Sequence, residues 1–163
     1  MSTVINPVSF ASELVPDFYS AGFSKEADTA VVNSTLISEP DLRFDFGAYQ
    51  RFAFRYTLFY TTNATADFKF RLAVPINLAL WRNLREELAP AATAFTLTLD
   101  AANNGTTDLT ILAASGTEGF ARGTGILVAG PTAGAFQLQW SQNTTNAGPT
   151  TLRAGSILEY KQF

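Results

Sequence analysis

The strongest constraint on the fold is a strict alternation of apolar and other side chains in two neighbouring segments, Phe52–Tyr60 and Asp67–Val74. Successive side chains of a strand point to opposite faces of a sheet, so a period of two predicts strands with one buried face. The six residues between the segments are small or polar, which predicts an antiparallel hairpin with a wide loop. Antiparallel sheets with one wet face pack into sandwiches or barrels. The pattern predicts a structural framework and indicates no catalytic or ligand-binding site.

Similar strand patterns continue along most of the chain, separated by clusters of Gly, Pro, Asn and Thr. Short strands at regular spacing predict an all-β fold, an antiparallel β-sandwich or jelly roll. We therefore expect one β-sandwich domain over residues 29–163. The nine predicted strands are Ala30–Ile37, Leu42–Phe46, Phe52–Tyr60, Asp67–Val74, Phe95–Leu99, Leu109–Ala113, Gly125–Val128, Phe136–Gln142 and Leu152–Lys161.

One segment, Asn77–Leu88, is expected to form a short helix or helical insertion. Its apolar residues recur at helical spacing, and Arg82 can pair with Glu86 one turn further on. Pro90 marks the end of this helix. The residues at helical spacing are Leu78, Trp81, Leu84 and Leu88.

The first 28 residues differ from the rest, because their aromatic and aliphatic side chains are spaced irregularly among Pro7, Pro16 and Gly22. Two interpretations are open. The segment forms a short helix folded on its own domain, or it is an apolar arm that becomes ordered against another protein. On the second interpretation, residues 1–28 are an N-terminal arm whose docking residues are Phe10, Leu14, Phe18, Tyr19 and Phe23.

Composition points away from chemistry and towards contact with neighbours. The chain has no Cys and no His, so it lacks thiolate chemistry, the commonest general base and the commonest metal ligand. Charged residues make up 15% of the chain, against about 25% in typical domains. The surface must therefore be covered largely by Thr, Asn, Gln, Ser and Ala, as is more usual where neighbouring molecules cover it.

Charge and hydropathy also bear on partners and location. The net charge is −3 and the basic residues are scattered singly, so we expect no nucleic-acid binding. No apolar run approaches the roughly 18 residues of a membrane span, and the first residues do not resemble a secretion signal. We expect synthesis and folding in a cytoplasm and no membrane partner.

We predict no enzyme, no catalytic residue, no cofactor and no metal. A Ser or Thr nucleophile would need a base, and Lys25, Lys69 and Lys161 are expected to be solvated. The Gly-rich stretches 116–120 and 123–126 are expected to be β-turns, and Asp100–Asp108 does not match a calcium loop. Asp45 and Asp67 are expected on the wet faces of strands, and Glu86 and Glu87 on the polar side of the expected helix, so no hydrolase pair is predicted. The carboxylates considered for such a pair are Asp41, Asp45, Asp67, Glu86 and Glu87.

The two tryptophans are expected to play different parts. Trp140 follows Phe136 and Leu138 on the inward face of a strand, which predicts core packing. Trp81 lies in the expected helix, and an exposed Trp there could anchor an interface. Trp81 is therefore a possible exposed contact, and Phe120 is a second one.

The C-terminal stretch Phe136–Tyr160 resembles the closing hairpin of a widespread family of tailed-bacteriophage structural domains. In that family a strand ending in Trp-x-Gln-Asn leads through a Thr/Ala-rich loop into an Arg-Ala-Gly-Ser strand, as Trp140–Asn143 and Arg153–Ser156 do here. Asn77–Leu88 departs from the family's Gly/Ala-rich loop. Upstream segments that follow the family's order are Val31–Leu36, Asp41–Phe44, Phe52–Tyr60, Ala66–Phe70 and Pro75.

The resemblance implies a jelly-roll β-sandwich with a structural role in the virion, commonly as a homotrimer. A capsid decoration (cement) protein on the major capsid protein lattice is the expectation that best suits a single domain with an apolar arm. The alternative is a tail-fibre or head-fibre module that binds a host receptor or glycan through loops near Trp81 and Phe120.

Overall fold

The computed structural model describes residues 21–63, 65–88, 96–100, 109–111 and 118–163. All regular structure in these residues is β, and none of it is helix. The strands are β1 (Ala21–Ser24), β2 (Thr29–Val31), β3 (Ile37–Phe46), β4 (Arg51–Thr61), β5 (Phe68–Ala73), β6 (Leu80–Leu88), β7 (Thr96–Asp100), β8 (Leu109–Ile111), β9 (Glu118–Val128), β10 (Gly134–Gln142), β11 (Thr150–Leu152) and β12 (Ile157–Gln162).

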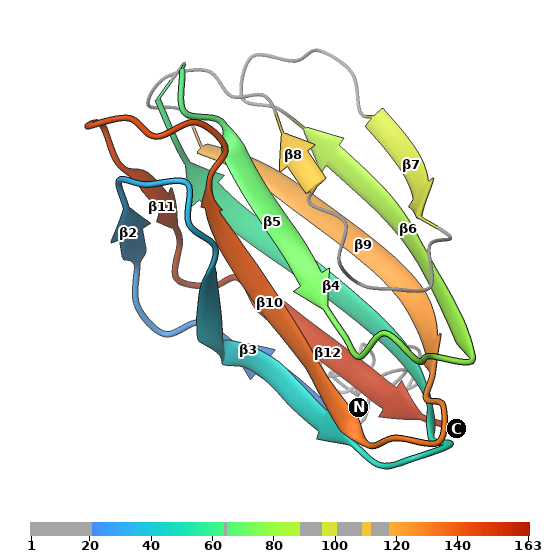
Figure 1. Ribbon diagram of the computed structural model, residues 1–163. Helices are drawn as coiled ribbons and strands as arrows, with labels where there is room; N and C mark the ends of the chain where they lie inside the picture. Colours follow the sequence, from blue (N-terminus) through green and yellow to red (C-terminus); the bar gives the residue numbers. More distant parts are fainter. Residues whose placement is uncertain (1–20, 64, 89–95, 101–108, 112–117) are drawn as a thin grey trace, which may run out of the picture.

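The described strands form two antiparallel sheets packed face to face, which confirms the predicted all-β sandwich (Figure 1). The larger sheet has eight strands, six of them in the order β1-β12-β4-β9-β6-β7. The short strand β11 pairs with β4 and with β2 at one end of this sheet. The smaller sheet has four strands in the order β3-β10-β5-β8.

The alternating segments are strands with the predicted buried faces, but they do not form a hairpin. β4 pairs with β9, β11 and β12, whereas β5 pairs with β8 and β10 in the other sheet. The connection between them therefore crosses from one sheet to the other, and their aromatic faces meet in the core. Tyr60 stacks on Phe68 with ring centroids 4.4 Å apart, and Tyr56 meets Phe70 edge to face.

The predicted helix is wrong, because its residues form the interior strand β6 between β7 and β9. Trp81 points into the core, and Leu84 points outward with 44% of its surface exposed. Spacing of three and four residues fits one helical face, whereas in the strand burial alternates, with Asn83 and Arg85 buried on the same side as Trp81. The two neighbouring strands supply backbone partners for both edges of β6, so tertiary pairing decides the outcome.

The Gly-rich segment 123–126 is not a turn, since it lies inside β9. Gly123 is paired with Tyr56, and Gly125 with Phe54, across the β4–β9 ladder. A Cβ atom on Gly123 would lie 2.5 Å from the Tyr56 hydroxyl oxygen and 2.6 Å from the ring. The two glycines therefore leave room for two large aromatic side chains in the core.

Part of the predicted N-terminal arm belongs to the larger sheet. β1 pairs with β12 from Ala21 to Ser24, four residues that precede the predicted boundary at residue 28. The backbone of Lys25 then bonds to the turn before β12, with Lys25 N donating to Ser156 O at 2.8 Å and Gly155 N donating to Lys25 O at 2.9 Å. The entry of the chain into the sandwich is thus tied to its C-terminal strand.

Candidate binding surfaces

Phe23 is the one predicted docking residue whose position the structure describes; Phe10, Leu14, Phe18 and Tyr19 lie outside the described residues. The Phe23 side chain is 37% exposed and stacks on Tyr160, with ring centroids 6.0 Å apart. Tyr160 in turn stacks on Phe44 at 4.2 Å, and Phe44 on Phe136 at 5.0 Å. A row of stacked rings therefore runs from the surface at β1 into the core.

A hollow of about 470 Å³ lies beside this row, between the edge strands β1 and β3. Its aromatic side is formed by Phe23, Phe44 and Tyr160. Its polar side carries Glu26, Asp41, Arg43 and Asp45, and Arg43 binds Asp45 at 2.6 Å. An apolar side chain with a polar neighbour would fit such a mixed surface.

Residues 21–25, where the predicted arm joins the sandwich, are called the arm root. Lys25 is buried there, so the prediction that it is solvated is wrong. Its Nζ lies 2.9 Å from Glu39 Oε2, and both side chains are 2% exposed. Lys25 Nζ also donates to Thr29 Oγ1 at 2.7 Å, and Trp140 Nε1 donates to the same Glu39 oxygen at 3.2 Å. Because Glu39 is in β3 and Lys25 precedes β2, this network links the arm root to both sheets.

The structure separates the two proposed exposed contacts. Trp81 is 3% exposed and stacks on Phe54 at 5.2 Å, so it is a core residue and offers no surface anchor. Phe120 is half-buried on the outer face of β9, opposite Phe59 of β4. Trp140 is completely buried, as predicted.

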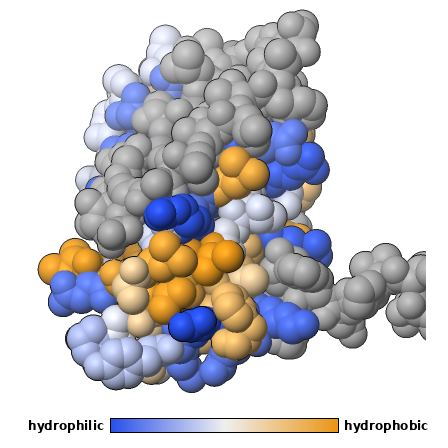
Figure 2. Space-filling model, turned by 90° about the vertical axis from the view of Figure 1, so that its right-hand side faces the viewer, coloured by the Kyte–Doolittle hydropathy of each residue, from blue (hydrophilic) through white to orange (hydrophobic). Residues whose placement is uncertain are grey.

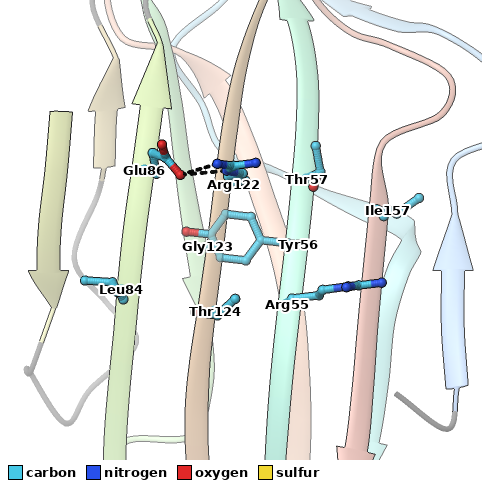
Figure 3. Close-up of a pocket in the computed structure, with 9 residues that line it drawn as sticks. All are labelled: Arg55, Tyr56, Thr57, Leu84, Glu86, Arg122, Gly123, Thr124 and Ile157. Atoms are coloured by element: carbon cyan, nitrogen blue, oxygen red, sulfur yellow. Dashed lines mark hydrogen bonds and ion pairs between the residues drawn. The ribbon is translucent and has the colours of Figure 1, made fainter. Parts of the chain in front are cut away.

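A second hollow, of about 400 Å³, lies on the outer face of the larger sheet. Figure 3 looks at this face: Arg122 and Glu86 point towards each other from β9 and β6, and Arg55 extends over β12. Arg122 binds Glu86 at 2.7 Å, and Arg55 binds Glu159 through both carboxylate oxygens. Glu86 is thus a strand residue in an ion pair rather than the polar side of a helix.

Apolar side chains also reach the surface near this face. Figure 2 views the sandwich from the flank next to β6, where orange apolar side chains gather in the lower half among blue polar ones. Exposed large hydrophobic residues on or next to β6 and β9 are Ile76, Leu84 and Ile126, at 69%, 44% and 40% exposure. The solvent-facing side of this sheet is therefore mixed rather than uniformly polar.

The described residues contain no group of three or more His, Cys, Asp or Glu side chains placed to hold a metal ion. Within the same residues, no helix has the length and apolar character needed to cross a membrane. Both hollows are lined by charged, polar and apolar groups, and each contains at least one member of an ion pair, which suits them to binding another surface.

Comparison with known proteins adds little. No family model matches the chain, and no curated protein matches it. A chain in "Structure of infectious bursal disease virus Gx strain" is similar over 88% of this chain and 40% of its own length, with 8% identity and a TM-score of 0.21. This chain therefore spans less than half of that one, and a likeness this weak carries no argument about function.

Sequence reasoning missed the two hollows and the buried Lys25–Glu39 pair. Each depends on strands that are distant in the chain: β1 with β3, and β12 with β4, β9 and β6. A signal was present for the outer face, because Arg55-Tyr-Thr and Arg122-Gly-Thr share a pattern. Only the pairing of β4 with β9 places the Arg of each segment opposite the Thr of the other.

Proposed function

We propose that this chain is a bacteriophage virion structural protein, a capsid decoration protein that binds the assembled major capsid protein as a trimer and stabilises the lattice. It would be made in the host cytoplasm and reside on the capsid surface. The mechanism is binding without chemistry. The N-terminal arm docks across capsid subunits, and the sandwich holds the arm in place.

The architecture supports the resemblance on which the proposal rests. Strands β3 to β10 are distributed as β3-β10-β5-β8 and β4-β9-β6-β7. Strands that alternate between two sheets in this way are typical of a jelly-roll winding, an architecture common in viral capsid domains. The stretch Phe136–Tyr160, which carries the closest resemblance, supplies β11 and most of β10 and β12.

The observation that carries the proposal is the anchored root of the arm. Phe23 belongs both to the predicted docking residues and to the ring stack that ends in the core at Phe136. The buried Lys25–Glu39 ion pair holds the residue that directly follows β1. An arm that starts from a rigid point loses less freedom on docking, so more of its contact energy appears as affinity.

Three arms in one trimer would act together. Once one arm is bound, the other two are held near their sites, and linked weak contacts give high effective concentration. Low charge over the chain suits a surface that is covered in the virion.

Cosedimentation with capsids that lack this protein tests the proposal. The variant lacks residues 1–20, which leaves β1 intact. The control is Tyr49→Asn, because Tyr49 is 71% exposed with φ of 61°, and Asn tolerates that conformation. We expect saturable binding by the full chain and the control, and loss of at least about tenfold in affinity for the truncated chain.

Light scattering and a host-cell adsorption assay accompany this experiment. A monomer in solution and on capsids would contradict the trimer, and full capsid binding without residues 1–20 would contradict docking by the arm. No capsid binding, together with adsorption to cells or a glycan array, would assign the protein to the fibre alternative.

A further inference from the structure

The outer face of the larger sheet carries a repeated pattern of side chains. Across the strands from β12 to β6, the row through Ile157 and Thr57 continues into Arg122 and Glu86. It therefore begins with an aliphatic residue and a threonine, and it ends with an arginine and a glutamate joined at 2.7 Å.

The next row contains the same side-chain types in the opposite direction. From β6 to β12 it consists of Leu84, Thr124, Arg55 and Glu159. Its arginine and glutamate are also an ion pair, with Arg55 Nη2 donating to Glu159 Oε1 at 2.9 Å. The two rows are related by a local two-fold axis that is perpendicular to the sheet and passes between Tyr56 and Gly123.

The ion pairs in the two halves of this face also match in exposure. The arginine and glutamate side chains are 48% and 23% exposed in one pair, and 56% and 27% exposed in the other. Each half therefore has a charged part, made by a partly exposed ion pair. Beside it lie a threonine and an aliphatic residue that line the hollow of about 400 Å³, and this part is exposed at Thr124 and Leu84 and half-buried at Thr57 and Ile157.

We propose that this face binds the same face of a second copy of the chain about a two-fold axis. A two-fold axis lying between two such faces, either along or across the strands, places each ion pair over the threonine and aliphatic residue of the other copy. The long charged side chains then lie over shorter uncharged ones, and no charge is placed opposite a like charge. Such a self-complementary patch is what an isologous interface requires.

This contact goes beyond the proposed function, because trimers joined through it would form even-numbered assemblies or link neighbours on a lattice. The face carries two arginines and two glutamates, so its own net charge is zero. Contact energy would come from the apolar parts at Leu84 and Ile157 and from close packing of the ion pairs over Thr57 and Thr124.

Thr124 allows a test that does not depend on the direction of the axis. With the axis along the strands, Thr124 faces Arg55 of the second copy, and with the axis across the strands it faces Arg122. Thr124→Arg therefore places arginine against arginine twice in each pair of copies. Thr124→Glu also replaces threonine with a longer charged side chain, but it places glutamate against arginine.

Sedimentation velocity of the full chain over a range of concentrations measures the association. We expect masses that are even multiples of the chain or of its trimer. Thr124→Arg should weaken this association by at least about tenfold, because it opposes arginine to arginine twice in each pair of copies. Thr124→Glu should keep or strengthen it, and the control Thr132→Arg, in an exposed loop, should leave it unchanged.

Circular dichroism and thermal melting establish that all three variants are folded, as expected for exposed positions. The proposal is overturned if the wild-type chain forms no even-numbered assembly. It is also overturned if the two Thr124 variants weaken association equally, or if Thr132→Arg weakens it as much as Thr124→Arg. Capsid binding is measured separately, so its loss or retention does not decide this result.

Discussion

At the scale of single residues, Gly123 shows how a missing side chain shapes the core. It lies opposite Tyr56, whose ring occupies the space where a Cβ atom would be. We expect Gly123→Ala to lower the free energy of unfolding by about 1–3 kcal/mol, the usual cost of overpacking a core. Urea denaturation measures this, with Thr124→Ala on the outward face of the same strand as the control. Equal stability of the two variants would show that the Tyr56 ring moves without cost.

Lys25 and Glu39 are a second case, because two charges are buried together. Glu39→Gln should destabilise the protein by about 3–5 kcal/mol, since it leaves a buried ammonium without its counter-charge. The double variant Lys25→Met, Glu39→Gln should recover most of this loss, because it removes both charges. A double-mutant cycle on unfolding free energies measures the coupling, and a coupling near zero would contradict a joint role for the pair.

At the scale of the element, β6 shows why the spacing of apolar residues was insufficient to distinguish a helix from a strand. Leu78, Trp81, Leu84 and Leu88 fit a helical face, but in the strand Trp81 is buried and Leu84 is exposed. Pairing with β9 places Trp81 opposite Leu127, and the Trp81 ring stacks on Phe54 in the core. A sequence pattern reports which side chains could share a face, and it does not report which neighbouring strands are present to bond the backbone.

The alternation along β6 gives a direct prediction. Trp81→Ala should cost about 3–5 kcal/mol because it removes a large buried ring. Arg82→Ala, one residue further on and exposed, should change stability by less than about 0.5 kcal/mol. Thermal or urea unfolding of both variants checks this. Similar losses at the two positions would be inconsistent with a strand whose successive side chains face opposite sides.

At the scale of the whole molecule, the sandwich is closed by contacts between distant parts of the chain. β1 pairs with β12, and the arm root bonds to the turn at Gly155, whose φ is 83°. The domain that must be kept in a truncation therefore begins at Ala21. The predicted boundary at residue 28 would remove this strand and the buried Lys25.

Two truncations test where the stable unit starts. A chain without residues 1–20 should retain the melting temperature of the full chain, because it keeps β1 and the Phe23–Tyr160 stack. A chain without residues 1–24 should melt at least about 2–4 °C lower, the shift that a loss of 1 kcal/mol produces in a domain of this size. Calorimetry measures both. An unchanged melting temperature for the second chain would mean that β1 adds no stability.

The sequence by itself determined that the fold is a β-sandwich and which faces of two main strands are buried, although it also predicted a helix where β6 lies. A period of two is a local property, and Phe52–Tyr60 and Phe68–Val74 keep it in the structure. The sequence also determined the absence of His and Cys chemistry. The candidate docking residues of the arm were found from composition and spacing, and Phe23 is the one that the structure places.

Only the tertiary structure decided which strands pair and what their outward faces carry. It placed β4 and β5 in different sheets, turned the expected helix into β6, and buried Lys25 against Glu39. It also aligned Arg55 and Arg122 about a local two-fold axis. Strand pairing depends on closure over long stretches of chain and on matched volumes such as Tyr56 against Gly123, and neither is encoded in a local repeat.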